Sequence, residues 1–112
     1  MGGQPLHETF SVDRGDLVRS VVPARGTPYQ HRCSLASYEA VAHAAEEIGS
    51  DGITLERLAA EAGVPNTQAA VALAFLKDRG CVTRAHGRIH VPASGGLHLD
   101  AMIEYHALAV GG

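Results

Sequence analysis

Residues 53–92 read ITLERLAAEAGVPNTQAAVALAFLKDRGCVTRAHGRIHVP, and the order of residue types in this stretch decides the fold. Apolar residues recur at spacings of three and four after Thr54 and again after Asn66, which predicts two helices. Gly63 lies between them and is suited to the left-handed conformation that ends a helix. After Gly80, two short runs of strand-forming residues flank a glycine turn and predict a hairpin. The stretch therefore predicts a helix, a turn, a second helix and a β-hairpin.

Two more helices flank this unit. Residues 35–48 place their apolar side chains on one face, with Ser34 as N-cap and Gly49 as the left-handed stop. Ile53 is expected to pair with the hairpin as a strand of one residue. A last helix is predicted over residues 98–110, after a glycine-rich hinge. The expected fold class is α+β.

The N-terminal arm, residues 1–32, is expected to be partly ordered, and its sequence allows two structures. Phe10 to Val22 form a hairpin if residues 13–16 turn, or a short helix if Asp16 acts as an N-cap. Residues 23–28 contain two prolines and a glycine and are predicted to be a linker. The expected organisation is therefore an arm over residues 1–32, a central domain over 33–92 and a C-terminal helix over 93–112.

Length and charge restrict the function. A chain of 112 residues has room for one domain with a modest core. The formal net charge of −3 argues against a strongly basic nucleic-acid binder. The charge is uneven, however, because residues 64–92 carry four basic side chains against Asp78 alone. The basic part of the chain therefore coincides with the second predicted helix and the hairpin.

Cysteine content and hydropathy indicate the compartment. Two cysteines, Cys33 and Cys81, are too few for a disulfide framework and favour a reducing environment. Apolar runs stay well below the roughly 18 residues that span a membrane. The first ten residues lack the basic and apolar regions of a signal peptide. We therefore expect a cytoplasmic protein without membrane association.

Residues 35–92 resemble the winged helix-turn-helix domains of bacterial MarR-like and ArsR-like transcription regulators. The matching residues are Thr54-Leu55, Leu58-Ala59, Gly63-Val64, Ala72-Leu73, Leu76, Asp78-Arg79-Gly80 and Val82. The resemblance implies a three-helix core with a β-hairpin wing, a homodimer built through flanking helices, and binding of double-stranded DNA. In such domains the second helix of the turn enters a DNA groove.

The chain departs from the pattern of these regulators at the second helix. Pro65 stands where a capping Ser or Thr is usual, so Asn66 is expected to cap the helix instead. Only three polar residues remain as readers of bases or phosphates, because the outward positions further along are apolar. These three are Asn66, Thr67 and Gln68. Asn and Gln can bind adenine through two hydrogen bonds, but none of the three neutralises a phosphate.

The hairpin supplies the remaining DNA-binding candidates, Arg84, His86 and Arg88. Strand alternation predicts that Arg88 and His90 share one face while Ile89 and Val91 share the other. The polar face is expected either to contact DNA phosphates or to be an ordinary solvated strand face. Two arginines neutralise about two phosphates, and a dimer doubles this number.

Four apolar residues on the second helix offer an alternative site: Ala70, Val71, Ala74 and Phe75. An exposed strip of this kind is unfavourable in a free monomer. Three explanations stay open: cover by the N-terminal arm or the last helix, a dimer contact, or docking of a protein partner. The alternative function is therefore a winged-helix protein–protein interaction module.

Metal and catalytic motifs are not recognisable in the sequence. His31 and Cys33 are two residues apart and Cys81, His86 and His90 fall on the hairpin, but Cys-x-x-Cys motifs and closely spaced histidine pairs on a helix are missing. Glycine-rich phosphate loops and nucleophile elbows are missing as well. We therefore expect no metal, no cofactor and no enzyme activity, with sensing of a small ligand or metal as a third option. The favoured prediction is a DNA-binding transcriptional regulator.

Overall fold

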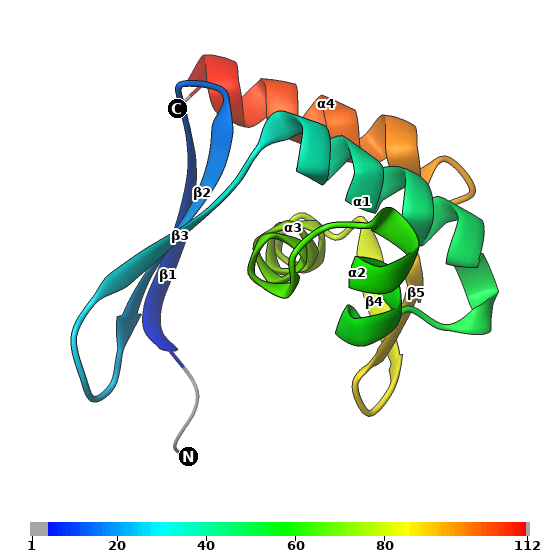
Figure 1. Ribbon diagram of the computed structural model, residues 1–112, viewed down its shortest axis with the longest axis horizontal. Helices are drawn as coiled ribbons and strands as arrows, with labels where there is room; N and C mark the ends of the chain where they lie inside the picture. Colours follow the sequence, from blue (N-terminus) through cyan, green and yellow to red (C-terminus); the bar gives the residue numbers. More distant parts are fainter. Residues whose placement is uncertain (1–4, 112) are drawn as a thin grey trace.

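The computed structural model describes residues 5–111, which form a mixed α+β fold of four α-helices and two small antiparallel sheets (Figure 1). The elements in chain order are β1 (Pro5–Asp13), β2 (Asp16–Pro23), β3 (Tyr29–Cys33), α1 (Leu35–Ile48), the 3-10 turn η1 (Gly49–Asp51), α2 (Leu55–Ala62), α3 (Asn66–Asp78), β4 (Val82–His86), β5 (Ile89–Pro92) and α4 (Leu97–Gly111). The strands β1–β3 are called the N-terminal sheet below, and β4–β5 the C-terminal hairpin.

The N-terminal sheet is a meander in the order β1-β2-β3. Its first turn places Arg14 and Gly15 at φ values of 53° and 85° and brings Asp13 opposite Asp16, the backbone of a tight hairpin. This result decides the open question at Phe10–Val22 in favour of strands over a helix. Strand β3 was not predicted from the sequence. Residues 1–4 of the expected arm lie outside the described residues.

Helix ends in the central region follow the predicted signals. The Ser34 and Thr54 hydroxyls accept hydrogen bonds from backbone N–H groups three residues later, at 3.1 and 3.2 Å. Gly63 ends α2 in the left-handed conformation at a φ of 69°. The prediction that Asn66 caps α3 is wrong, because Pro65 occupies the N-cap position and Asn66 is the first helical residue.

The core lies where α1, α3 and α4 meet the N-terminal sheet. Tyr38 of α1 is fully buried, and its hydroxyl donates to the carbonyl oxygen of Ala101 at 2.7 Å. Its ring meets Phe75 edge-on, and Phe75 in turn contacts Phe10 of β1 with ring centroids 5.3 Å apart. The side chains of Val71 and Phe75 are 1% and 0% exposed. Of the four apolar residues singled out on α3, Val71 and Phe75 are therefore covered within the same chain, and Phe10 of the arm contributes to this cover.

The C-terminal hairpin is joined to the turn before α2. The backbone groups of Ile53 and His90 exchange two hydrogen bonds of 2.7 and 2.9 Å, as the sequence predicted for Ile53. The register shifts between Arg84 and His86. His90, which is held by the bridge to Ile53, is 8% exposed, whereas Ile89 is 37% exposed. The prediction that Arg88 and His90 share a face agrees with the structure, because both line the groove described below, but His90 is buried there and not solvated.

Helix α4 closes the fold over α1 and the edge of the N-terminal sheet. Leu97, Ala101 and Tyr105 are its buried residues, and the Tyr105 hydroxyl donates to the carbonyl oxygen of Gly15 at 2.6 Å. Its opposite side exposes Leu99, Ile103 and Val110. Across residues 5–111, every helix is too short or too polar to cross a bilayer.

Candidate nucleic-acid interface

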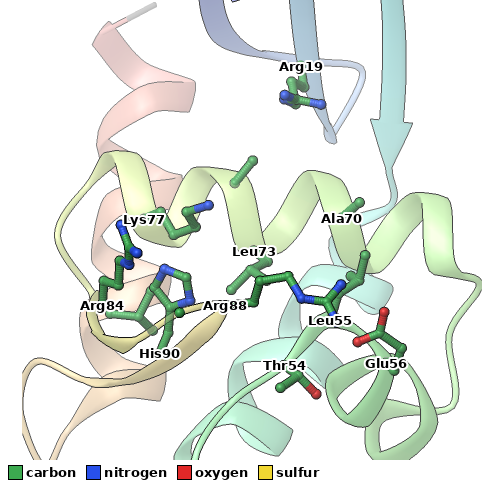
Figure 2. Close-up of a pocket in the computed structure, with 13 residues that line it drawn as sticks. Arg19, Thr54, Leu55, Glu56, Ala70, Leu73, Lys77, Arg84, Arg88 and His90 are labelled. Atoms are coloured by element: carbon green, nitrogen blue, oxygen red, sulfur yellow. The ribbon is translucent and has the colours of Figure 1, made fainter. Parts of the chain in front are cut away.

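A groove of about 720 Å³ runs along α3 between β2, the C-terminal hairpin and the start of α2 (Figure 2). Its floor is formed by Ala70, Leu73 and Ala74 of α3. Thr54 and Leu55 line one end, where α2 begins. The small alanine side chains keep the helix backbone close to the groove surface, so a bound molecule can approach α3 closely.

Basic side chains dominate the walls of the groove. Lys77, Arg84, Arg88 and Arg19 line it, against a single acidic residue, Glu56. Arg19 is ion-paired with Glu8 of β1. Lys77, Arg84 and Arg88 form no ion pair with any residue in the range 5–111. A protein of net charge −3 thus concentrates three uncompensated positive charges on one concave surface, where they attract anions.

Different elements bring these cations together. Lys77 lies in the last turn of α3, where its positive charge interacts favourably with the negative end of the helix dipole. Arg84 belongs to β4, and Arg88 follows Gly87, whose positive φ of 56° makes the hairpin turn. Arg19 comes from the central strand of the N-terminal sheet. The groove therefore exists only when the sheet, α3 and the hairpin are packed together.

The other N-terminal arginines do not join the groove. Arg32 donates to the carboxylates of Asp13 and Asp16 at 2.9 and 3.1 Å, and these hydrogen bonds raise the pKa of its guanidinium. Arg14 and Arg25 are exposed in the two turns of the sheet. Of the four arginines in residues 1–32, Arg19 alone lines the groove.

His90 lines the groove between α3 and the hairpin, near Lys77 and Arg84 (Figure 2). Burial, followed by the positive charges of Lys77 and Arg84, lowers the pKa of its imidazole below 6.5. The ring is therefore neutral at pH 7. Its Nδ1 atom is buried and has no hydrogen-bond partner in the described part of the chain. A buried side-chain nitrogen without a partner is uncommon in folded proteins.

The structure separates the DNA-binding residues predicted from the sequence. Arg84 and Arg88 enter the groove, whereas the exposed His86 and the three polar residues at the start of α3 do not line it. Asn66 and Thr67 are exposed and free to contact a ligand beyond the groove. Gln68 is not, because its Oε1 atom accepts a hydrogen bond from the backbone N–H of Ser34 at 3.0 Å.

The four apolar residues of the alternative site also divide between two faces of α3. Ala70 and Ala74 line the groove, while Val71 and Phe75 are buried toward the N-terminal sheet. A protein-docking surface that depends on Val71 and Phe75 does not exist in this fold, because both side chains are already in the core. The alternative that α3 docks a protein partner through Val71 and Phe75 is therefore not compatible with the burial of these two side chains.

Two of the lysine and arginine residues of the groove, Lys77 and Arg19, were not among the predicted site residues. Lys77 follows Ala70 and Ala74 at spacings of seven and three, so helical periodicity alone could have placed it on their face. Arg19 has no local signal, because its position depends on how β2 packs against α3.

Both cysteines are buried, which raises the pKa of Cys33 to about 12 and that of Cys81 to about 11. Their thiols stay protonated, so neither is poised to bind a metal.

Comparison with models of known protein families, with curated proteins and with solved structures finds no match for this chain. Its function therefore has to be inferred from its own residues and their geometry.

Proposed function

We propose that residues 33–92 form a winged-helix domain that binds double-stranded DNA mainly through the phosphate backbone, with the C-terminal hairpin as the wing. The observation that carries this proposal is the set of three unpaired cations, Lys77, Arg84 and Arg88, on one groove along α3. Phosphate contacts supply most of the affinity of sequence-independent DNA binding. Side chains that hold no carboxylate partner are available for such contacts without first breaking an ion pair.

The floor of the groove indicates what kind of DNA binding to expect. Ala70 and Ala74 have no hydrogen-bonding groups, so this face of α3 offers base edges no hydrogen-bond readout, only apolar contact such as that with a thymine methyl group. Only Asn66 and Thr67, at the exposed start of α3, remain as readers. We therefore propose a cytoplasmic DNA-binding protein of low sequence specificity, acting in transcriptional control.

The outer side of α4 supports a homodimer. Leu99, Ile103 and Val110 are exposed and lie at spacings of four and seven residues, along one side of the helix. Two copies that pack these helices together would bury the apolar stripe and place two grooves on one assembly. Such a dimer doubles the number of phosphate contacts, which matters because three cations per chain give only weak binding.

The test is a fluorescence-anisotropy titration of a short random duplex at several salt concentrations. Three phosphate contacts per chain predict a slope of log K against log salt of about −3 per chain. The double variant Arg84→Ala/Arg88→Ala should lower the magnitude of that slope by about two. Absence of binding at low salt with micromolar protein would overturn the proposal.

A matched control separates the groove from the overall charge. Arg32→Ala/Arg57→Ala also removes two positive charges, but both arginines lie outside the groove and are paired with acidic side chains. This variant should keep the slope of the unmodified chain. An equal loss in both double variants would mean that net charge alone governs binding.

A second candidate follows from the size of the groove. A volume of about 720 Å³ lies within the range of small-molecule sites, roughly 300–1,000 Å³. An apolar floor under three cations fits a small phosphorylated or carboxylated compound. Calorimetry with a nucleoside monophosphate distinguishes the two: tight binding of this compound, with no binding of duplex, would favour the small ligand over DNA.

A further inference from the structure

A cluster of potential metal ligands lies at the junction of α1 and α4, apart from the groove. Glu39 and His43 are one turn apart on α1, and His98 stands at the start of α4. One ligand atom from each residue falls within 4.8 Å of the others. We propose that Glu39, His43 and His98 bind a divalent transition metal of the zinc class. This proposal is independent of the DNA-binding proposal.

The spacing between His98 and Glu39 fits such an ion. The His98 Nε2 atom lies 3.5 Å from the Glu39 Oε2 atom. Zinc bonds to histidine nitrogen and carboxylate oxygen are about 2.0–2.2 Å, so two ligands at a tetrahedral angle are separated by about 3.4 Å. The observed pair is therefore already at the separation that a shared ion requires.

The bonding state of His98 also points to a ligand. Its Nε2 atom is buried and makes no hydrogen bond within residues 5–111, although a carboxylate oxygen is close by. Buried side-chain nitrogens are usually satisfied. The backbone of the same residue is fixed, because its N–H donates to Glu46 Oε1 at 3.0 Å. His98 is thus held in place while its ring nitrogen remains available for an ion.

His43 completes the set after a side-chain rotation. Its ring stacks on His98, with centroids 3.7 Å apart and planes 16° from parallel. Stacked rings direct their nitrogen lone pairs side by side, so one ring must turn for both to bind a single ion. His43 is exposed and has the freedom to do so. The stack already holds the two imidazoles within reach of one another.

Two histidines and one carboxylate define the chemistry of the site. Imidazole with carboxylate suits Zn²⁺ and related ions better than Ca²⁺ or Mg²⁺, which prefer oxygen ligands. Three protein ligands leave a fourth tetrahedral position for water. Because the ligands come from both α1 and α4, a bound ion would link these helices and stabilise the folded chain.

The test is titration of the metal-free protein with Zn²⁺ by calorimetry, with Co²⁺ as a spectroscopic substitute. We expect one ion per chain, visible absorption bands of tetrahedral Co²⁺, and a melting temperature raised by roughly 5–10 °C at saturation. The variants His43→Gln, His98→Gln and Glu39→Gln should each weaken Zn²⁺ binding by more than about tenfold, since even residues that only orient ligands change affinity by that much.

His106→Gln is the matched control, because it removes another exposed histidine from α4 outside the cluster. This variant should bind Zn²⁺ like the unmodified chain. Circular dichroism establishes that each variant is folded before titration. The proposal is overturned if the unmodified chain takes up no Zn²⁺ or Co²⁺, or if folded cluster variants bind as tightly as the control. Either result would mean that the approach of His98 to Glu39 plays no part in metal binding.

Discussion

The two β-sheets of this protein flank the same helix and differ in how their arginines are used. In the N-terminal sheet, Arg19 pairs with Glu8, and Arg32 pairs with Asp13 and Asp16. In the C-terminal hairpin, Arg84 and Arg88 have no ion-pair partner anywhere in the described chain. The two strand arginines of the N-terminal sheet are thus ion-paired within that sheet, whereas the two arginines of the hairpin face solvent. The availability of charge, more than the net charge of −3, therefore locates the candidate interface.

The helix between the two sheets shows the same division. Toward the N-terminal sheet, α3 presents Val71 and Phe75, which fill the core. Toward the hairpin it presents the two alanines of the groove floor, next to Lys77. One side of α3 thus holds the fold together, and the other remains accessible to a ligand. Each prediction below tests this contrast.

The largest effect is expected from Phe75→Ala. This side chain is fully buried between Phe10 and Tyr38, so its removal should lower the free energy of unfolding by about 3–5 kcal/mol. Lys77→Ala, on the opposite side of α3, should change it by less than about 0.5 kcal/mol. Urea denaturation followed by circular dichroism measures both. Similar values for the two variants would show that the sheet does not anchor on Phe75.

A smaller loss is expected from Gly52→Ala, at the junction of α2 and the hairpin. Gly52 has a φ of 106°, and an added Cβ would lie 2.8 Å from Cγ2 of Ile89. Strain at such a position costs about 1–3 kcal/mol. Thermal unfolding measures the loss. Ile89→Ala in the same chain should recover the part that is due to the contact, and failure to recover any would assign the whole cost to the backbone.

The paired and unpaired arginines can be compared directly, because Arg19 and Arg84 line the same groove. Arg19→Ala breaks a half-buried ion pair and should destabilise the fold by about 1 kcal/mol. Arg84→Ala should change stability by less than about 0.5 kcal/mol while weakening DNA binding. Urea midpoints and anisotropy titrations give the two readouts. Equal stability losses would remove the proposed distinction between the two sheets.

The smallest effect is the pH dependence set by His90. Its pKa is lowered in the folded chain, so below pH 6.5 the unfolded state binds more protons than the folded state. Stability is therefore fully present above pH 6.5 and falls as the pH drops through the folded pKa. Protonation also adds a positive charge beside Lys77 and Arg84, so DNA affinity should rise over the same range. His90→Gln should reduce both trends, and unchanged trends would assign them to other groups.

Much of the central fold could be predicted from local signals. Helix α1 was predicted over the observed residues, with Ser34 as its N-cap. Helix α2 begins after Thr54 and ends at Gly63, as the sequence also predicted. These signals are local, because a cap or a left-handed glycine acts within one turn of the backbone. The same locality explains why the hairpin strands, predicted over residues 81–84 and 88–91, end within two residues of the observed β4 and β5.

What could not be predicted depends on contacts between distant residues. Strand β3 has no apolar alternation and is a strand because it pairs with β2, where Leu17 meets Cys33. Arg19 enters the groove through that sheet, and His90 turns inward through the bridge to Ile53. The proposed metal site shows the same limit, since Glu39 and His43 are one turn apart on α1 but need His98 from α4.

The hydrogen bond from the Tyr105 hydroxyl to the Gly15 carbonyl oxygen joins residues 90 positions apart. During synthesis Gly15 leaves the ribosome long before Tyr105, so this hydrogen bond cannot form until α4 has been made. Contacts between such distant residues close late and slow the final folding step. A chain that lacks α4 would therefore lack this hydrogen bond, and the apolar surface that α4 covers would be exposed and prone to aggregation.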